Sequence, residues 1–144
     1  EGARLGEDIG GREGRRVAGP NVARRIEIAV EEAVRARSLE EALRNIEATV
    51  GNSVMTVESV PAAIGIFVAA GGDPRESAVG GTNIGNDTDT IAAMAGALAG
   101  ALRGIDAVPE AMRTTVVAAN AEDISQLADG LTAIARRRAG SVAG

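Results

Sequence analysis

The sequence lacks cysteine and histidine, and its 144 residues include no tryptophan, no tyrosine and a single phenylalanine, Phe67. The absence of cysteine excludes a disulfide framework and a thiol nucleophile within this chain. The absence of histidine excludes a Ser-His-Asp triad, and together the two absences exclude a cysteine or histidine zinc site. Any metal bound here must therefore be a hard cation held by oxygen. Because aromatic residues are scarce, close packing of small aliphatic side chains has to form the core.

Long apolar runs are missing too. No stretch approaches the roughly 20 uncharged residues that span a bilayer, and no charged-then-apolar signal segment opens the chain. We therefore expect no membrane association and a reducing, cytoplasmic location. A chain of this length predicts one core.

Lysine is absent, so all 15 basic residues are arginine, and 20 acidic residues give a net charge of −5. The arginine clusters are scattered on this acidic chain and lack aromatic partners for stacking bases. We expect them on solvated helix faces or at helix ends, and we expect no nucleic-acid partner. The clusters are Arg15-Arg16, Arg24-Arg25 and Arg136-Arg137-Arg138.

Helix-start signals recur after residue 20. Asn21 is a cap residue, and two pairs predict capping boxes, Ser38 with Glu41 and Asp73 with Glu76. Pro61 predicts a helix that starts near it, and the glycine pair at 71–72 predicts its end.

Apolar residues follow these signals at helical spacing. A stripe recurs every four residues over 22–36, and further faces occur over 39–50 and 124–134. The stretch TTVVAA is too short to establish a strand. We therefore predict an all-α fold, a compact multi-helix domain with antiparallel helices joined by short loops. The stripe consists of Val22, Ile26, Val30 and Val34; the second face has Leu39, Leu43, Ile46 and Val50.

The stretch GNDTDTIAAMAGALAG, residues 85–100, places two acids and two threonines before a run of small residues. If the helix runs from Thr88, Asp87 and Thr90 lie one turn apart and Asp89 points to an adjacent sector. In one interpretation Asp87 caps the helix and Asp89 favours its positive end. In another, two carboxylates and a hydroxyl bind Mg²⁺ or Mn²⁺, with further oxygen ligands from elsewhere. Spacing alone leaves both open.

The small residues of this run predict close helix packing. Ala92, Gly96 and Gly100 share one ridge, and Ala93 and Ala97 share the next. We expect other backbones to approach this helix from several sides, as they approach a central helix.

Residues 58–112 closely resemble the C-terminal part of the ADP-ribosylglycohydrolase family, which includes the hydrolase that removes ADP-ribose from dinitrogenase reductase. The most specific element is N-x-G-x-D-T-D-T followed by a small-residue helix. The SVPAA segment lies upstream and a G-x-x-A-x-P segment lies downstream, at family-like distances. The matching residues are Asn83, Gly85, Asp87, Thr88, Asp89 and Thr90, and then Gly104, Ala107 and Pro109.

The resemblance implies an all-α hydrolase with two Mg²⁺ or Mn²⁺ ions that cleaves an N- or O-glycosidic bond to the ribose of ADP-ribose. It carries metal-ligand roles over to Asp87, Asp89 and Thr90. It implies that Asn83, Gly85 and Asn86 shape the loop around the site. The implied partner is an ADP-ribosylated protein or a small ribosyl substrate, and the complete protein is expected to be a monomer. The catalytic residue stays unidentified.

The family's N-terminal half contributes a second metal motif, Thr or Ser followed by two Asp, and no such motif occurs here. The chain also starts without Met, and residues 1–20 mix glycine with alternating charges. We therefore expect residues 1–20 to be a mobile lead-in or a remnant of a preceding segment. Residues 21–144 are expected to be the C-terminal part of one domain, inactive alone. The alternative is a non-catalytic relict with a structural or binding role.

Overall fold

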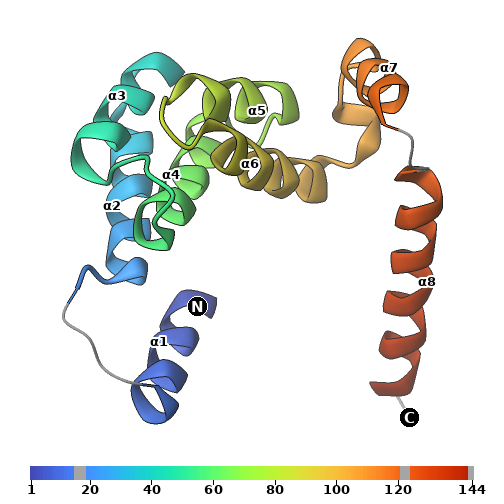
Figure 1. Cartoon of the computed structure of the whole chain (residues 1–144), viewed down its shortest axis with the longest axis horizontal. Coiled ribbons are helices and arrows are strands. Elements are labelled where there is room, and N and C mark those ends of the chain that lie inside the picture. The colour runs from blue at the N-terminus through green and yellow to red at the C-terminus, as the bar shows by residue number, and fades with distance from the viewer. Residues whose placement is uncertain (15–18, 121–123, 143–144) are drawn as a thin grey trace. The chain divides into compact units, whose positions relative to one another are not determined.

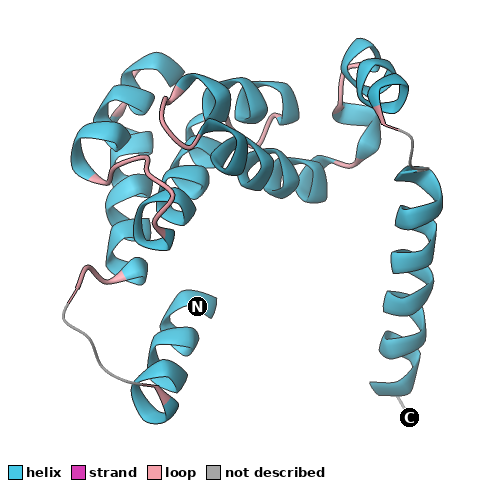
Figure 2. Cartoon of the chain, viewed as in Figure 1, coloured by secondary structure: helices cyan, strands magenta, loops and turns pink. Residues whose placement is uncertain are grey.

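A computed structural model describes residues 1–14, 19–120 and 124–142, and every regular element in these ranges is helical (Figure 2). This confirms the all-α prediction, and TTVVAA lies within a helix. The chain divides into two compact units, Glu1–Val108 and Pro109–Gly144. The first contains α1 (Gly2–Glu13), α2 (Val22–Arg35), α3 (Leu39–Thr49), α4 (Thr56–Ala69), α5 (Pro74–Asn83), α6 (Thr88–Arg103) and the 3₁₀ turn η1 (Ile105–Ala107). The second contains α7 (Glu110–Ala119) and α8 (Ile124–Val142).

Three predicted caps are confirmed. In each, a side-chain oxygen accepts a hydrogen bond from the backbone N–H three residues later, which satisfies one of the unpaired donors of the first turn. The caps are Asn21 at 2.8 Å, Ser38 at 3.2 Å and Asp73 at 2.8 Å.

The second hydrogen bond predicted for each capping box, from the backbone N–H of the cap residue to the glutamate side chain, does not form, so this part of the prediction is wrong. The Glu41 carboxylate accepts from the Arg37 backbone N–H at 2.9 Å instead of reaching Ser38. It does so because the Arg37 guanidinium pairs with the same carboxylate at 3.2 Å. Glu76 likewise pairs with its neighbour Arg75.

One expectation about a helix start is corrected. Helix α4 begins at Thr56, so Pro61 lies inside it rather than at its start. Its fixed φ suits a helix, and the cost is one hydrogen bond lost in the second turn. Residues 2–13, within the segment expected to be a mobile lead-in or a remnant of a preceding segment, form α1, in which Arg12 pairs with Asp8 at 2.7 Å.

Helix α4 occupies the middle of the first unit, with α2 and α3 on one side and α5 and α6 on the other (Figure 1). The core is built from small aliphatic residues, as expected from the lack of aromatics. The buried cluster contains Ala29, Ala42, Ile46, Val50, Ala62, Ala63, Ile66, Ile84, Ile91 and Ala95.

The buried face of α2 differs from the predicted stripe. Ala29 and Ala33 are buried, whereas Val34 is 71% exposed. A step of four residues advances about 40° beyond a full helical turn, so a stripe repeated every four residues rotates away from a straight neighbour.

The close approach predicted around α6 occurs on one side only. A methyl group at Gly81 of α5 would lie 2.4 Å from the Cα of Ala92, so these two backbones nearly touch. In contrast, Ala93 and Ala97 are exposed, and a methyl group at Gly100 would meet nothing within 4 Å. Among the described residues of the first unit, α6 therefore packs on α4 and α5 through the face that carries Ile91, Ala95 and Ala99.

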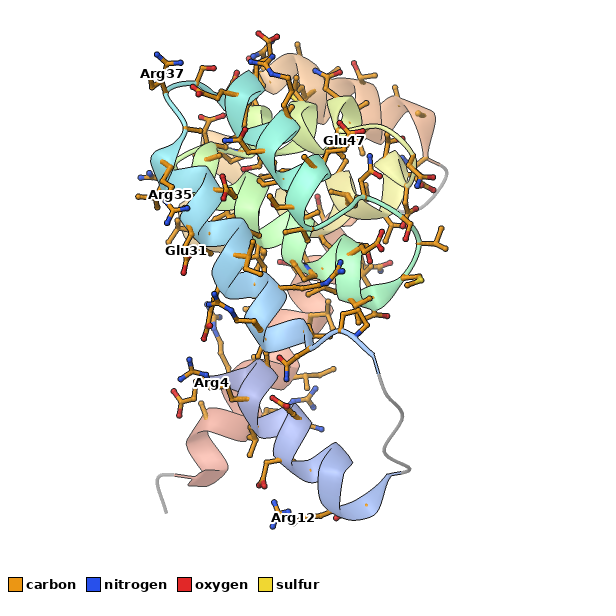
Figure 3. All side chains as sticks on the ribbon, turned by 90° about the vertical axis from the view of Figure 1, so that its left-hand side faces the viewer. Arg4, Arg12, Glu31, Arg35, Arg37 and Glu47 are labelled. Carbon is orange, nitrogen blue, oxygen red and sulfur yellow. The ribbon has the colours of Figure 1, made fainter. Side chains whose placement is uncertain are left out.

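Arginines of the first unit pair with acids on the helix surfaces. Arg35 lies 3.8 Å from Glu31, and both side chains project outward from α2, as does Arg37 from the following turn (Figure 3). Such exposed pairs contribute less than about 1 kcal/mol each. Arg15 and Arg16 lie outside the described residues. None of the described helices combines the length and apolarity needed to cross a membrane.

Candidate functional site

The acidic motif lies in a tight turn between α5 and α6. Gly85 and Asn86 have left-handed φ angles of 88° and 54°, and Asn86 is the one described non-glycine residue with positive φ. This conformation costs about 1 to 3 kcal/mol for a residue with a side chain. The Thr88 N–H donates to the Asn86 carbonyl at 2.9 Å. The turn thus sharply redirects the chain into α6 at Asp87.

Asp87 is the N-cap residue of α6 and is only 8% exposed. Its carbonyl accepts the Ile91 N–H at 3.1 Å, but its side chain makes no capping hydrogen bond. The interpretation of Asp87 as a side-chain cap is therefore wrong. The residue as a whole is nearly buried, but its carboxylate oxygens are not among the buried polar atoms that lack a partner, so they reach solvent. The Asp87 oxygens are therefore open to a cation.

Asp89 and Thr90 follow in the first turn of α6 and are both exposed. The helix starts at Thr88, so the predicted register is confirmed, with Asp87 and Thr90 one turn apart. Among the residues that the structure describes, no group of three or more acidic, histidine or cysteine side chains could hold a metal ion. The motif itself offers two carboxylates and one hydroxyl.

The other predicted loop residues surround this turn. Asn83 is the last residue of α5 and is exposed, whereas Ile84 after it is buried and anchors the loop in the core. Gly85 and Asn86 form the turn itself.

Asn52, which the sequence analysis did not identify, holds this turn from the loop between α3 and α4. Its backbone carbonyl accepts the Asp87 N–H at 3.1 Å, and its side-chain Nδ2 donates to the Ile84 carbonyl at 2.8 Å. The segment Gly51-Asn52-Ser53 has turn composition, but no sequence pattern connects it with a loop 32 residues later.

Glu58 at the start of α4 holds the loop that contains Asn52. Its carboxylate accepts the Ser53 N–H at 3.1 Å and lies 3.9 Å from Arg25, which also donates to the Val50 carbonyl. Hydrogen bonding by the Ser53 side chain and then by its backbone N–H, with a smaller contribution from the charge of Arg25, lowers the pKa of Glu58.

Replacing Glu58 with glutamine is expected to lower the free energy of unfolding by about 1 kcal/mol at pH 7, because a charge-assisted hydrogen bond becomes a neutral one. The folded-state pKa of Glu58 lies below its ordinary value of 4.5. The stabilisation is therefore complete above pH 4.5 and is lost as the pH falls through the folded-state pKa. Urea denaturation of wild type and variant at pH 7 and pH 3 measures this difference. Glu47→Gln, at an exposed position on α3, is the matched control; an equal effect of both variants at pH 7 contradicts the prediction.

We compared the chain with protein families and with known proteins, and one family model matches it. The family model described as ADP-ribosylglycohydrolase matches residues 6–140. The chain is 38% identical over 118 residues to YegU of Escherichia coli strain K12, an uncharacterized protein, which covers 82% of this chain. It is 41% identical over 70 residues to the human ADP-ribosylhydrolase ARH3, which covers 42% of this chain. No solved structure matches it.

These relatives are longer than the chain. The aligned residues make up 35% of YegU and 19% of human ARH3. The ARH3 of Danio rerio, 40% identical over 83 residues, is likewise matched over 21% of its length. The chain therefore spans about a third of YegU.

Proposed function

Since the chain belongs to the ADP-ribosylglycohydrolase family, we propose that the protein carrying it hydrolyses an N- or O-glycosidic bond to the ribose of ADP-ribose, in a metal-dependent reaction and as a monomer. The observation that supports this most is Asp87 at the start of α6, a residue only 8% exposed whose carboxylate makes no capping bond. The name of the ARH3 relatives, ADP-ribosylhydrolase, agrees with the proposed reaction. The substrate is an ADP-ribosylated protein or a small ribosyl compound.

The residues of the turn fit a hard cation. Carboxylate and hydroxyl oxygens are the donors that Mg²⁺ and Mn²⁺ prefer, and Asp87, Asp89 and Thr90 would supply them. Such a cation, when bound, supplies Lewis-acid stabilisation of the charge that develops as the glycosidic bond breaks. Three residues do not complete six-fold coordination, so the remaining ligands come from water or from residues beyond this motif.

The chain's own residues provide a rigid frame for these oxygens. The core position of Ile84 and the bond from Asp87 to Asn52 hold the turn in place. Asn83, Gly85 and Asn86 would shape the loop around the site.

The test is release of ADP-ribose by the complete gene product. We expect hydrolysis of at least one of three substrates, arginine-linked ADP-ribose, serine-linked ADP-ribose and a small nucleoside conjugate. Activity should disappear with EDTA and return with Mg²⁺ or Mn²⁺. Turnover that persists in excess EDTA contradicts the metal requirement, and no release from any of the three contradicts the proposed reaction.

A second candidate function is a structural or binding role without catalysis. It is favoured by the observation that no group of three or more acidic, histidine or cysteine side chains among the described residues could hold a metal ion. The genomic sequence upstream of Glu1 discriminates between the two functions. An in-frame T-D-D or S-D-D motif supports the enzyme, and a start codon near Glu1 supports the non-catalytic relative.

The 144 residues purified alone are expected to release no ADP-ribose and to bind Mg²⁺ or Mn²⁺ no tighter than about 1 mM, because three ligand residues leave the cation mainly to water. We also expect self-association, since an apolar groove of about 370 Å³ lies between α4 and α6, lined by residues that include Val60, Ile64, Met94 and Leu98. Isothermal titration calorimetry and light scattering measure both properties. A micromolar site for two ions on a monodisperse monomer would overturn this prediction.

A further inference from the structure

Asn52 contacts the acidic turn at two points, one on each side of its strained residues. The side-chain amide bonds to the carbonyl of Ile84, which precedes Gly85 and Asn86, and the backbone carbonyl bonds to the N–H of Asp87, which follows them. One residue from a different loop thus forms hydrogen bonds with both ends of the turn.

Both contacts stabilise the turn. Ile84 is the C-cap residue of α5, where carbonyls lose their helical donors, so its oxygen requires a partner from elsewhere. Residues with left-handed φ persist only where the surrounding structure holds them. The amide of Asn52 lies over the turn, since a methyl group at Gly85 would be 3.5 Å from its Nδ2. Because the acceptor is a carbonyl, the amide nitrogen is the end that faces it.

Asn52 is itself firmly held. The residue after it, Ser53, donates its N–H to the Glu58 carboxylate at 3.1 Å. The residue before it, Gly51, has a φ of 94° and packs so closely that a methyl group there would lie 2.6 Å from a carboxylate oxygen of Glu58. Asn52 therefore links the acidic turn to the start of α4, and these contacts fix the position of the turn relative to that helix.

We propose that Asn52 is a positioning residue that sets the orientation of the Asp87 carboxylate for metal binding. The inference rests on the proposed function, because it assigns to Asn52 a role in the metal site of that reaction. The bonds of Asn52 go to backbone atoms of Ile84 and Asp87, so its proposed role is not that of a ligand. It acts through the two ends of the turn, and residues that orient metal ligands in this way contribute about 10- to 100-fold to metal affinity or activity.

The test compares Asn52→Ala and Asn52→Asp in the complete gene product. Both variants keep the backbone carbonyl and remove the donor to Ile84. We expect Mn²⁺ binding, followed by the electron paramagnetic resonance signal of free Mn²⁺ without substrate, to weaken about 10- to 100-fold. The far-UV circular dichroism spectrum should be unchanged. Asn45→Ala, on α3 of the same unit, is the matched control and should bind Mn²⁺ like the wild type.

The outcomes separate this inference from the proposed function. Wild-type Mn²⁺ affinity in both Asn52 variants overturns the positioning role even if the wild type hydrolyses ADP-ribosyl bonds. Mn²⁺ binding that weakens in both variants supports the role even if the substrate is a different one. A wild-type protein that binds no Mn²⁺ overturns both. A lower melting temperature with unchanged Mn²⁺ affinity indicates a purely structural hydrogen bond and also overturns the role.

Discussion

Asp87→Ala in the complete gene product is expected to lower the turnover of ADP-ribose release by more than about 100-fold, because loss of a ligand costs more than loss of a residue that orients one. The carboxylate of Asp87 makes no capping bond, so no part of the α6 cap depends on it. Asp89→Ala should have a comparable effect. The measurement is a steady-state assay at saturating Mn²⁺, accompanied by the circular dichroism spectrum of each variant.

Two further variants separate ligation from folding and from net charge. Asp87→Asn keeps the shape of the side chain and removes its charge, and we expect it to be nearly as inactive as the alanine variant. Asp106→Ala changes the net charge equally at an exposed position in η1 and should retain wild-type turnover. Unchanged turnover in Asp87→Asn would remove Asp87 from the metal site.

The second large effect is expected in the packing of α5 on α6. Gly81→Ala places a methyl group 2.4 Å from the Cα and 2.7 Å from the nitrogen of Ala92. Both of these are backbone atoms, so no side-chain rotation relieves the contact and the helices must separate. Overpacking of this kind costs about 1 to 3 kcal/mol, and we expect a loss at or above the upper end of that range. Urea denaturation followed by circular dichroism measures it.

Two glycines of α6 serve as controls for this substitution. A methyl group at Gly96 meets only the Cβ of Ala78, at 3.8 Å, and one at Gly100 meets nothing within 4 Å. Both positions gain up to about 1 kcal/mol of helix propensity when alanine replaces glycine. We therefore expect Gly96→Ala and Gly100→Ala to be neutral or stabilising. Equal destabilisation by all three variants would show that the close approach at Gly81 is not the cause.

The sequence by itself determined three helix caps and the start of α6, although it did not determine the return bonds of Glu41 and Glu76, which pair with neighbouring arginines instead. The caps at Asn21, Ser38 and Asp73 each join a side chain to a backbone N–H three residues later, and all three were predicted. The start of α6 at Thr88 and the position of its acidic motif follow from the same local rules. The helical class follows from the period of the apolar residues.

The tertiary structure decided which faces and loops meet. The buried face of α2 is centred on Ala29 because that side meets α4, and Gly81, rather than the glycines of α6, carries the closest helix contact. Asn52 reaches Ile84 across 32 residues. These contacts depend on how the helices cross, and the local pattern of a single sequence contains no information on crossing geometry. The acidic motif was therefore visible in the sequence, while the residue that holds it in place was visible only in the fold.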